Sequence, residues 1–311
     1  MLKRRLLKWV LILAVMVAGY SMLSRWLKST PQVPAGKGKV ALIHITGPMM
    51  SSKKTVELLE RYSEQEAIKA IVLRIDTPGG GVAVAQEIVR AMERAKSQGK
   101  KIVASLGSVA ASGGYYVASA AHAIIANEGT LTGSIGVIIS YPNAEELLKK
   151  IGLRFEVVKS GDYKDVGSPT RKLTKDEERI LKEMIDDVYG QFVNVIIKGR
   201  SEEIQKVVAA RDKIDLKAVT SEMVRDAVLK VSDGRIFSGA KAKEYGLVDG
   251  FGNITDAVEF AAARAGILGK PEVVEEHKRF SFLDYFLGEA SESVANHFSL
   301  DVPPIRYQLG F

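Results

Sequence analysis

Cysteine is absent from this 311-residue chain, and histidine is limited to four residues. Without cysteine, the chain has no disulfide bond, no thiol nucleophile and no thiolate metal site. The four histidines form no pattern such as H-E-x-x-H, which would mark a catalytic metal site. Two glycine patterns that bind phosphate, G-x-x-x-x-G-K-[ST] and G-x-G-x-x-G, are missing as well. We therefore expect neither a metal ion nor an organic cofactor.

Net positive charge is nearly absent outside the N-terminal region. The chain has a formal net charge of +7, and residues 1–39 contain eight Lys or Arg and no acidic residue. Subtracting these eight charges from +7 leaves residues 40–311 with a net charge of −1. A protein that binds nucleic acid carries its basic residues on the folded domain. This distribution therefore indicates no nucleic-acid partner.

One long apolar run lies within the basic N-terminal region. Residues 9–24 carry no charge, and basic residues flank them on both sides. The run approaches the length of about 20 residues that a membrane-spanning helix needs. We expect a basic segment at residues 1–8 and a single-pass transmembrane anchor at residues 9–27. Because positive charge is denser before the run, the rest of the chain is expected on the extracytoplasmic side of the cell membrane. A cleaved signal peptide is the alternative, although an A-x-A-like cleavage site is not evident.

The sequence after the anchor divides into a linker, a domain and a tail. Residues 28–38 are rich in Pro and Gly and predict a linker. In residues 39–265, strand-like and helix-like segments alternate, which predicts one α/β domain with a mainly parallel sheet covered by helices. Residues 266–311 form a C-terminal tail. Strands are expected at residues 39–45, 70–76, 101–106, 136–140 and 155–159, and helices at residues 82–96, 112–121, 143–150 and from the Thr174 cap onward.

Four loops of small residues each follow an expected strand, where the sites of such folds lie. The loop D-T-P-G-G-G contains Gly79 and Gly80, which let a ligand approach the backbone closely, so that its N–H groups can serve as oxyanion donors. An ordinary tight turn between strand and helix is the alternative. The four loops are D-T-P-G-G-G at residues 76–81, G-S-V-A-A-S-G-G-Y-Y at 107–116, T-G-S-I-G at 132–136 and S-G-D-Y-K-D-V-G-S-P-T-R at 160–171.

Ser112 lies where a strand is expected to turn into a helix. It is surrounded by small residues and is followed by Gly113, so backbone N–H groups are expected beside its hydroxyl. This setting suits a nucleophile whose tetrahedral intermediate is held by those N–H groups. An N-cap serine is the alternative, and only a partner base would distinguish the two interpretations.

Two residues are candidates for that base. His122 follows an alanine-rich segment and is expected at the start of a strand. Lys164 lies in the loop G-D-Y-K-D-V-G-S-P, and a lysine acts as a base once burial in an apolar pocket favours its neutral form. Asp162 and Asp165 would oppose that change if they faced the lysine. A solvated surface lysine is the alternative for Lys164.

The motifs and their order resemble those of signal peptide peptidase A in its short form. The resemblance covers about residues 39–265 and rests on S-V-A-A-S-G-G-Y-Y, D-T-P-G-G-G, T-G-S-I-G and G-D-Y-K-x-x-G-S-P. It implies a fold of the Clp-protease/crotonase type, built from repeated ββα or βα units. It also implies that Ser112 is the nucleophile and Lys164 the general base, that Ser134 hydrogen-bonds the lysine, and that the N–H groups of Gly113 and of Gly80 or Gly79 form the oxyanion hole.

The same resemblance implies a function. We expect a membrane-anchored serine endopeptidase that forms an acyl-enzyme and degrades short hydrophobic peptides, such as cleaved signal peptides. Long members of the family hold two similar domains, one supplying the serine and the other the lysine. This chain has one such domain, so we expect a homo-oligomeric ring in which Ser112 of one subunit faces Lys164 of its neighbour. Apolar residues in the segment 279–311 also make the tail a candidate for contact with the enzyme's own groove.

Three other functions are alternatives to this expectation. The first is a related membrane protease that cuts a specific membrane-protein partner. In cells that lack the enzyme, this partner would accumulate uncut. The second is a crotonase-like acyl-CoA enzyme, since the fold permits one, although the anchor and the motifs around Ser112 and Lys164 argue against it. The third is an inactive scaffold, which the presence of both residues disfavours.

Overall fold

A computed structural model describes residues 38–276 and 306–308 of the chain. The predicted basic segment at residues 1–8, the predicted anchor at residues 9–27 and nearly all of the predicted linker lie outside these residues. Within the described residues, no helix has the length and apolar character needed to cross a membrane.

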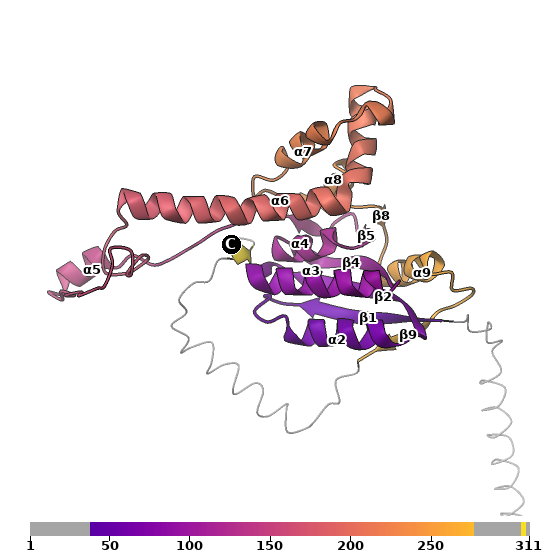
Figure 1. The fold of residues 1–311 in the computed structure, drawn as a ribbon, viewed down its shortest axis with the longest axis horizontal. Helices are drawn as coiled ribbons and strands as arrows, with labels where there is room; N and C mark the ends of the chain where they lie inside the picture. Colours follow the sequence, from indigo (N-terminus) through magenta and orange to yellow (C-terminus); the bar gives the residue numbers. More distant parts are fainter. Residues whose placement is uncertain (1–37, 277–305, 309–311) are drawn as a thin grey trace, which may run out of the picture.

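The centre of the fold is a mainly parallel sheet (Figure 1). Strands β1 (Lys39–Thr46), β2 (Ile68–Thr77) and β4 (Lys101–Ala111) lie side by side in parallel, and β9 (Glu272–Glu275) extends the sheet beside β1. Beyond β4 the sheet divides, because its middle pairs with β5 and its last three residues pair with β6. The remaining strands of this sheet are β5 (Ala123–Ala126), β6 (Leu131–Gly133), β7 (Ile236–Ser238), which is antiparallel to β6, and β8 (Gly250–Phe251), which is parallel to β5.

Helices cover both faces of the sheet, and this explains why its strands are almost continuously apolar. Along β2, Ile71, Leu73 and Ile75 contribute to the larger core, whereas Ala70 and Val72 contribute to a smaller core on the other face. Buried residues of α9 (Ile254–Arg264) belong to the smaller core. The larger core includes buried residues of α2 (Lys53–Glu64), α3 (Val82–Ser97), α4 (Gly113–Ser119) and α6 (Lys175–Asp212).

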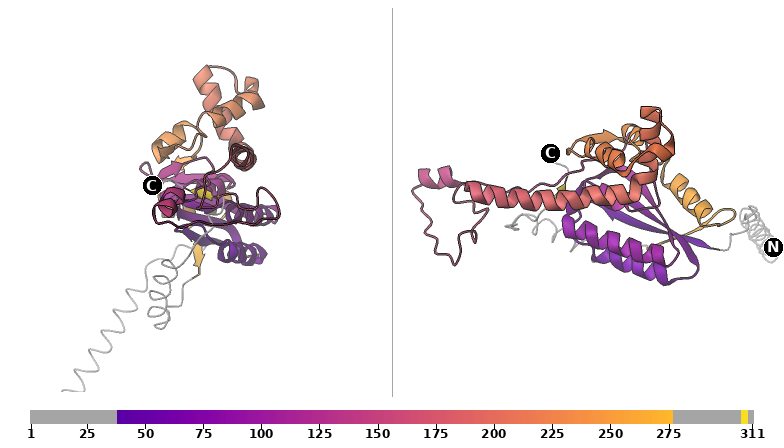
Figure 2. Two further views of the ribbon diagram at one scale, coloured as in Figure 1. Left: turned by 90° about the vertical axis from the view of Figure 1, so that its left-hand side faces the viewer. Right: turned by 45° about the horizontal axis from the view of Figure 1, so that its top comes forward.

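The long helix α6 extends beyond the sheet at its amino end. It begins after Thr174, whose side chain accepts a hydrogen bond from the N–H of Glu177, and the Glu177 side chain accepts one from the N–H of Thr174. The middle of α6 packs over the sheet, and its amino end extends past the sheet to α5 (Glu145–Lys150) (Figures 1 and 2). We call residues 141–174, which include α5, the arm. Three short helices complete the described residues: η1 (Leu216–Ala218), α7 (Ser221–Leu229) and α8 (Gly239–Glu244).

Most predicted elements of the domain are confirmed, and two predicted strands are wrong. Residues 136–140 and 155–159 form no strand. The second of these segments lies on the arm, where Phe155 is 55% exposed and Val158 is fully exposed, so no strand or core within residues 38–276 covers it. The strand predicted at residues 101–106 is longer than expected. It continues to Ala111 because its last residues pair with β6. The sheet also includes β9, so the domain extends beyond its predicted end at Ala265.

Candidate active site

Ser112 lies at the carboxyl end of β4, immediately before α4, as expected. Its φ of 53° and ψ of −116° are values that residues with a side chain rarely adopt. Two backbone hydrogen bonds impose this conformation: the N–H of Ser112 donates to the Gly133 carbonyl (2.8 Å), and its own carbonyl accepts from the N–H of Tyr116 (2.8 Å). The turn is thus fixed between β6 and α4, and strain of this kind is typical of functional positions.

The hydroxyl of Ser112 is buried and has no hydrogen-bond partner. Although Ser112 occupies the N-cap position of α4, its side chain does not cap the helix, so the alternative interpretation as an N-cap serine is wrong. Across the part of the chain that the structure describes, no other buried side-chain nitrogen or oxygen lacks a partner. A buried hydroxyl in this state costs about 1–3 kcal/mol. The fold therefore maintains a polar atom that contributes nothing to its stability.

The predicted glycine loop forms a short strand, β3 (Gly79–Gly81), at the carboxyl end of β2. The Gly79 carbonyl accepts from the N–H of Met49 (2.8 Å), and the N–H of Gly81 donates to the Met49 carbonyl (3.0 Å). The N–H of Gly79 also donates to Thr77 Oγ1 (3.1 Å). Because peptide groups alternate in direction along a strand, the N–H and C=O of Gly80 face the opposite edge. Gly80 is thus the better placed of the two predicted oxyanion donors.

Close packing requires glycine at two positions around this strand. A Cβ atom on Gly80 would lie 2.3 Å from the Met49 carbonyl oxygen, and one on Gly114 would lie 2.6 Å from Cγ2 of Thr77. The absence of these side chains lets β3 pack against Met49 and lets α4 pack against the end of β2, and β3 and α4 also contact one another. The structure therefore brings the glycine strand beside Gly113, at the start of the helix that follows Ser112.

Ser134 follows β6 and also has a positive φ, of 49°. Its N–H donates to the Arg235 carbonyl (2.8 Å), while the preceding residue, Gly133, accepts from the N–H of Ser112. The structure thus places the predicted supporting serine next to the predicted nucleophile. A hollow of about 430 Å³ opens beside Ser134 toward the surface, and it is lined also by residues 136–138 and by residues of α6 such as Tyr189.

Lys164 is not brought to Ser112 within this chain. It lies in the loop of the arm between α5 and α6, where its side chain is exposed and its N–H donates to the Gly161 carbonyl (3.2 Å). The arm projects away from the sheet, whereas Ser112 lies within the sheet layer at the start of α4 (Figures 1 and 2). A single copy therefore holds the serine with its glycines at one place and the lysine at another.

The loop that carries Lys164 is fastened by an ionic cluster that the sequence analysis missed. Arg171 donates to Asp165 (2.7 Å) and to Glu177 (2.5 Å), and Lys159 also donates to Asp165 (2.7 Å). The hydrogen bonds from Arg171 lower the pKa of Glu177 to about 2 and hold the pKa of Asp165 well below its usual value. Asp165 is thus engaged by two other cations, and we call these four residues the Arg171 cluster. Its members are scattered over the sequence without a motif, so only the folded loop reveals it.

His122 is unable to serve Ser112 as a base. Its Nδ1 accepts a hydrogen bond from the N–H of Ile102 (3.0 Å), at the amino end of β4. Ser112 follows the other end of that strand, about 30 Å away at the usual rise per residue. Burial lowers the pKa of His122, which favours a neutral structural imidazole.

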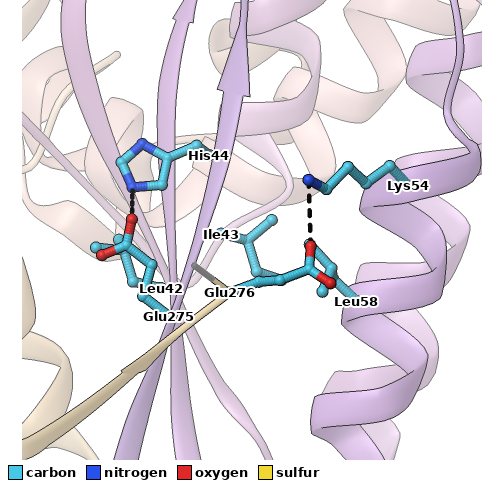
Figure 3. Close-up of a pocket in the computed structure, with 7 residues that line it drawn as sticks. All are labelled: Leu42, Ile43, His44, Lys54, Leu58, Glu275 and Glu276. Carbon is cyan, nitrogen blue, oxygen red and sulfur yellow. Dashed lines mark ion pairs between the residues drawn. The ribbon is translucent and has the colours of Figure 1, made fainter. Parts of the chain in front are cut away.

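A second hollow, of about 380 Å³, lies beside β1 and α2 (Figure 3). His44 Nε2 pairs with Glu275 (2.9 Å), and Lys54 pairs with Glu276 (3.2 Å). These ion pairs join the end of β9 to the body of the domain, and the hollow contains no candidate nucleophile. Among the residues described by the structure, no group of three His, Asp or Glu side chains is arranged to hold a metal ion.

Comparisons with known proteins agree with the motifs. Residues 94–225 match peptidase family S49. The chain is 41% identical over 238 residues to a putative protease of Synechocystis sp., covering 76% of this chain and 77% of the relative. It is 37% identical over 201 residues to a putative signal peptide peptidase SppA of Enterococcus faecium, covering 65% of this chain but only 52% of that relative. Among solved structures, a lysine-to-alanine mutant of the membrane-bound stomatin-specific protease 1510-N in complex with a substrate peptide covers 82% of this chain and 99% of its own, at 17% identity and a TM-score of 0.47.

Proposed function

This chain belongs to peptidase family S49 and is a serine endopeptidase, and we propose that Ser112 is its nucleophile and Lys164 of a neighbouring copy its base. The observation that carries the assignment of Ser112 is its buried hydroxyl, which the fold holds at a strained turn without a hydrogen-bond partner. Such a hydroxyl is free to form a new bond with a base and with a substrate carbonyl.

The proposed chemistry is acyl transfer through an acyl-enzyme. Neutral Lys164 accepts the proton of Ser112 as the serine oxygen attacks the peptide carbonyl, and the N–H groups of Gly80 and Gly113 hold the resulting oxyanion. The C–N bond then breaks, and the lysine returns the proton to the leaving amine. Water, activated by the same lysine, attacks the acyl-enzyme and releases the second product. Ser134, which lies next to Ser112, is proposed to hydrogen-bond this lysine.

A second copy of the chain is proposed to complete the site. The arm exposes a group of apolar side chains around the loop that carries Lys164, which is unusual for a free surface. The hollow beside Ser134 is open on the body of the same molecule. Contact of the arm of one copy with the body of the next would cover both surfaces, and we propose that repetition of this contact closes into a ring. The exposed apolar residues of the arm are Leu147, Ile151, Leu153, Phe155, Val157, Val158 and Tyr163.

We further propose short hydrophobic peptides, including cleaved signal peptides, as the substrates. The name of the Enterococcus faecium relative, a putative signal peptide peptidase, supports this class. The apolar run at residues 9–24 supports a membrane anchor, with the domain on the extracytoplasmic side of the cell membrane. An anchored enzyme would meet such peptides where they are left after secretion. The mainly parallel sheet and the glycine strand beside Ser112 support a Clp-protease/crotonase type of fold.

An active-site probe tests the assignment of both residues. The full-length chain, purified in detergent, is treated with a fluorophosphonate probe, and the labelled residue is identified by mass spectrometry. We expect label on Ser112, and we expect Lys164→Ala to slow labelling about 100-fold or more, because it removes the general base. Lys150→Ala, a change of another exposed lysine on the arm, is the control and should label at the wild-type rate. Label on a different serine, or equal rates for the two lysine variants, would refute the assignment.

A further inference from the structure

The two ends of the central strands have different surroundings. At the carboxyl ends, β10 (Arg306–Gln308) pairs with β3, which confirms the expected contact of the tail there. The amino ends of β1, β2, β4 and β9 lie at the opposite end of the domain, beside the loop that joins α9 to β9 (Figure 1). We call this end the amino edge, and it comprises residues 38–39, 64–69, 96–101, 122–123 and 264–272.

An apolar side chain projects from the amino edge. Leu268 is 80% exposed, more than any other leucine in the part of the chain that the structure describes. Its loop leaves α9 through Gly266, which has a φ of 71°, and the next residue, Ile267, is buried in the smaller core. Gly269 then turns the chain again, with a φ of 77°. Because Ile267 is held inside the domain, Leu268 is directed outward.

Further apolar surface lies beside this loop. Val273 on β9 is 43% exposed, and Phe260 on α9 is 38% exposed, with the guanidinium carbon of Arg264 5.6 Å from the centre of its ring. A hollow of about 230 Å³ lies between α9 and β9, and its lining includes Val258 and Pro271. A single exposed leucine is common on protein surfaces, whereas a group of apolar residues at one place indicates a contact surface.

Basic residues adjoin this apolar surface. Lys96, Lys101 and Arg264 lie around His122, where burial lowers the pKa of the imidazole and these three positive charges lower it further. Arg264 also donates a hydrogen bond to the His122 carbonyl (3.0 Å). Positive charge is therefore concentrated at the amino ends of β4 and β5.

The excess of positive charge extends along the whole amino edge. The edge contains seven basic and three acidic residues, a formal net charge of +4, whereas residues 40–311 together carry −1. One of the acidic residues, Glu272, is paired with Lys39 (2.6 Å). Among residues 38–276, Lys69, Lys101 and Lys270 form no ion pair with a carboxylate. These three lysines are thus available to an anionic partner.

The described chain also enters the domain at the amino edge. Gly38 is the first described residue, and a Cβ atom there would lie 3.1 Å from Cγ1 of Ile267. The proposed anchor ends at residue 27, and residues 28–37 can span at most about 35 Å. If the anchor crosses the membrane, the amino edge is therefore held close to the lipid surface.

We propose that the amino edge docks on an anionic phospholipid surface, with Leu268 inserted among the headgroups and the surrounding lysines placed on the phosphates. This inference rests on the proposed function, since it uses the proposed membrane anchor. An apolar side chain bordered by cations is the arrangement that such a surface binds. Docking would direct the carboxyl ends of the strands away from the membrane, with Ser112 about 30 Å from the lipid surface at the usual rise per residue of β4.

A single fluorescent label tests the insertion of Leu268. Because the chain contains no cysteine, Leu268→Cys can be labelled without background in the full-length chain, which is reconstituted into vesicles of phosphatidylcholine and phosphatidylglycerol. We expect lipids brominated near the headgroup to quench an environment-sensitive fluorophore at this position about 2-fold or more. Met50→Cys is the matched control, because Met50 is 59% exposed but follows the other end of β1. Its label should keep its emission.

Charge variants test the anionic partner. Lys270→Glu should reduce the quenching at residue 268 by about half or more, and vesicles of phosphatidylcholine alone should have the same effect. Lys53→Glu is the control, because it changes an exposed lysine at the start of α2, near the other end of β1. It should leave the quenching unchanged. Quenching that neither Lys270→Glu nor uncharged vesicles reduce would overturn the assignment of an anionic lipid partner.

Flotation of the vesicles in a density gradient separates failure of this proposal from failure of the proposed anchor. If the chain floats with the vesicles but the label at residue 268 is quenched no more than the label at residue 50, the amino edge does not dock. If the chain fails to float, the proposed anchor is wrong and the docking surface is wrong with it. Labelling of Ser112 by the active-site probe is independent of both results.

Discussion

At the scale of single residues, the candidate site contains positions whose conformation destabilises the fold. Ser112 adopts a strained backbone conformation and buries a hydroxyl without a partner, and the two penalties amount to about 1–3 kcal/mol each. The small-residue loops indicated Ser112 and Gly80, and the family resemblance indicated Ser134. The sequence pattern carries no sign of the positive φ values, because these arise from backbone bonds to Gly133 and Arg235, which are distant in the sequence.

Substitution of Ser112 should therefore abolish activity and at the same time stabilise the fold. Ser112→Gly relieves the backbone strain and removes the unsatisfied hydroxyl, so we expect the free energy of unfolding to rise by about 1 kcal/mol. The melting temperature should rise by about 2–4 °C for a domain of this size. Calorimetry of the full-length variants measures both values.

Ser105→Ala is the matched control for this prediction. Ser105 is also buried in β4, but its hydroxyl accepts a hydrogen bond from Arg74 (3.0 Å), so its loss should destabilise the fold by about 1 kcal/mol. If Ser112→Gly destabilised the protein as much as Ser105→Ala does, Ser112 would not be strained in the way described.

At the scale of elements, the arm departs furthest from what the sequence predicts. Its residues 155–159 include three apolar residues and were expected to form a strand, yet they lie in solvent in a single copy. An apolar sequence pattern predicts that a segment is buried. It does not predict whether the same chain or another molecule covers the segment. The strands and helices of the body were predictable because each is buried by neighbours within the same chain, as β2 is between two cores.

The Arg171 cluster gives the arm a pH-dependent stability. Asp165 and Glu177 have lowered pKa values in the folded chain, so the cluster stabilises the loop above their unfolded pKa of about 4. That stabilisation is lost as the pH falls from about 4 toward about 2, where Glu177 accepts a proton. Hydrogen exchange of residues 161–174 should accelerate in this range, after correction for the intrinsic effect of pH.

At neutral pH, Arg171→Ala should have the same effect on the loop and should lower kcat/KM about 10- to 100-fold by displacing Lys164. Arg179→Ala is the control, because Arg179 and its partner Glu183 on α6 are both exposed and their ion pair contributes little. Fast exchange in both arginine variants, or in neither, would show that the cluster does not hold the loop.

At the scale of the whole molecule, one copy contains the parts of a site without assembling them. Ser112, Ser134 and the glycines meet at the carboxyl edge of the sheet, whereas Lys164 is carried away on the arm (Figure 2). The motifs predicted both parts, and the family resemblance predicted that a second copy completes the site. The distance between the parts depends on the length and direction of α6, which the sequence pattern alone leaves open.

Mixing of inactive variants tests the shared site most directly. Ser112→Ala and Lys164→Ala chains, each inactive alone, are co-assembled in equal amounts, and co-assembly is verified with two different affinity tags. A site formed between copies is complete when an intact serine meets an intact lysine, which random assembly gives at about a quarter of the sites, so we predict about a quarter of the wild-type activity. The control replaces the Lys164→Ala partner with the double variant and should stay inactive. A verified mixed assembly of the two single variants without activity would contradict the account.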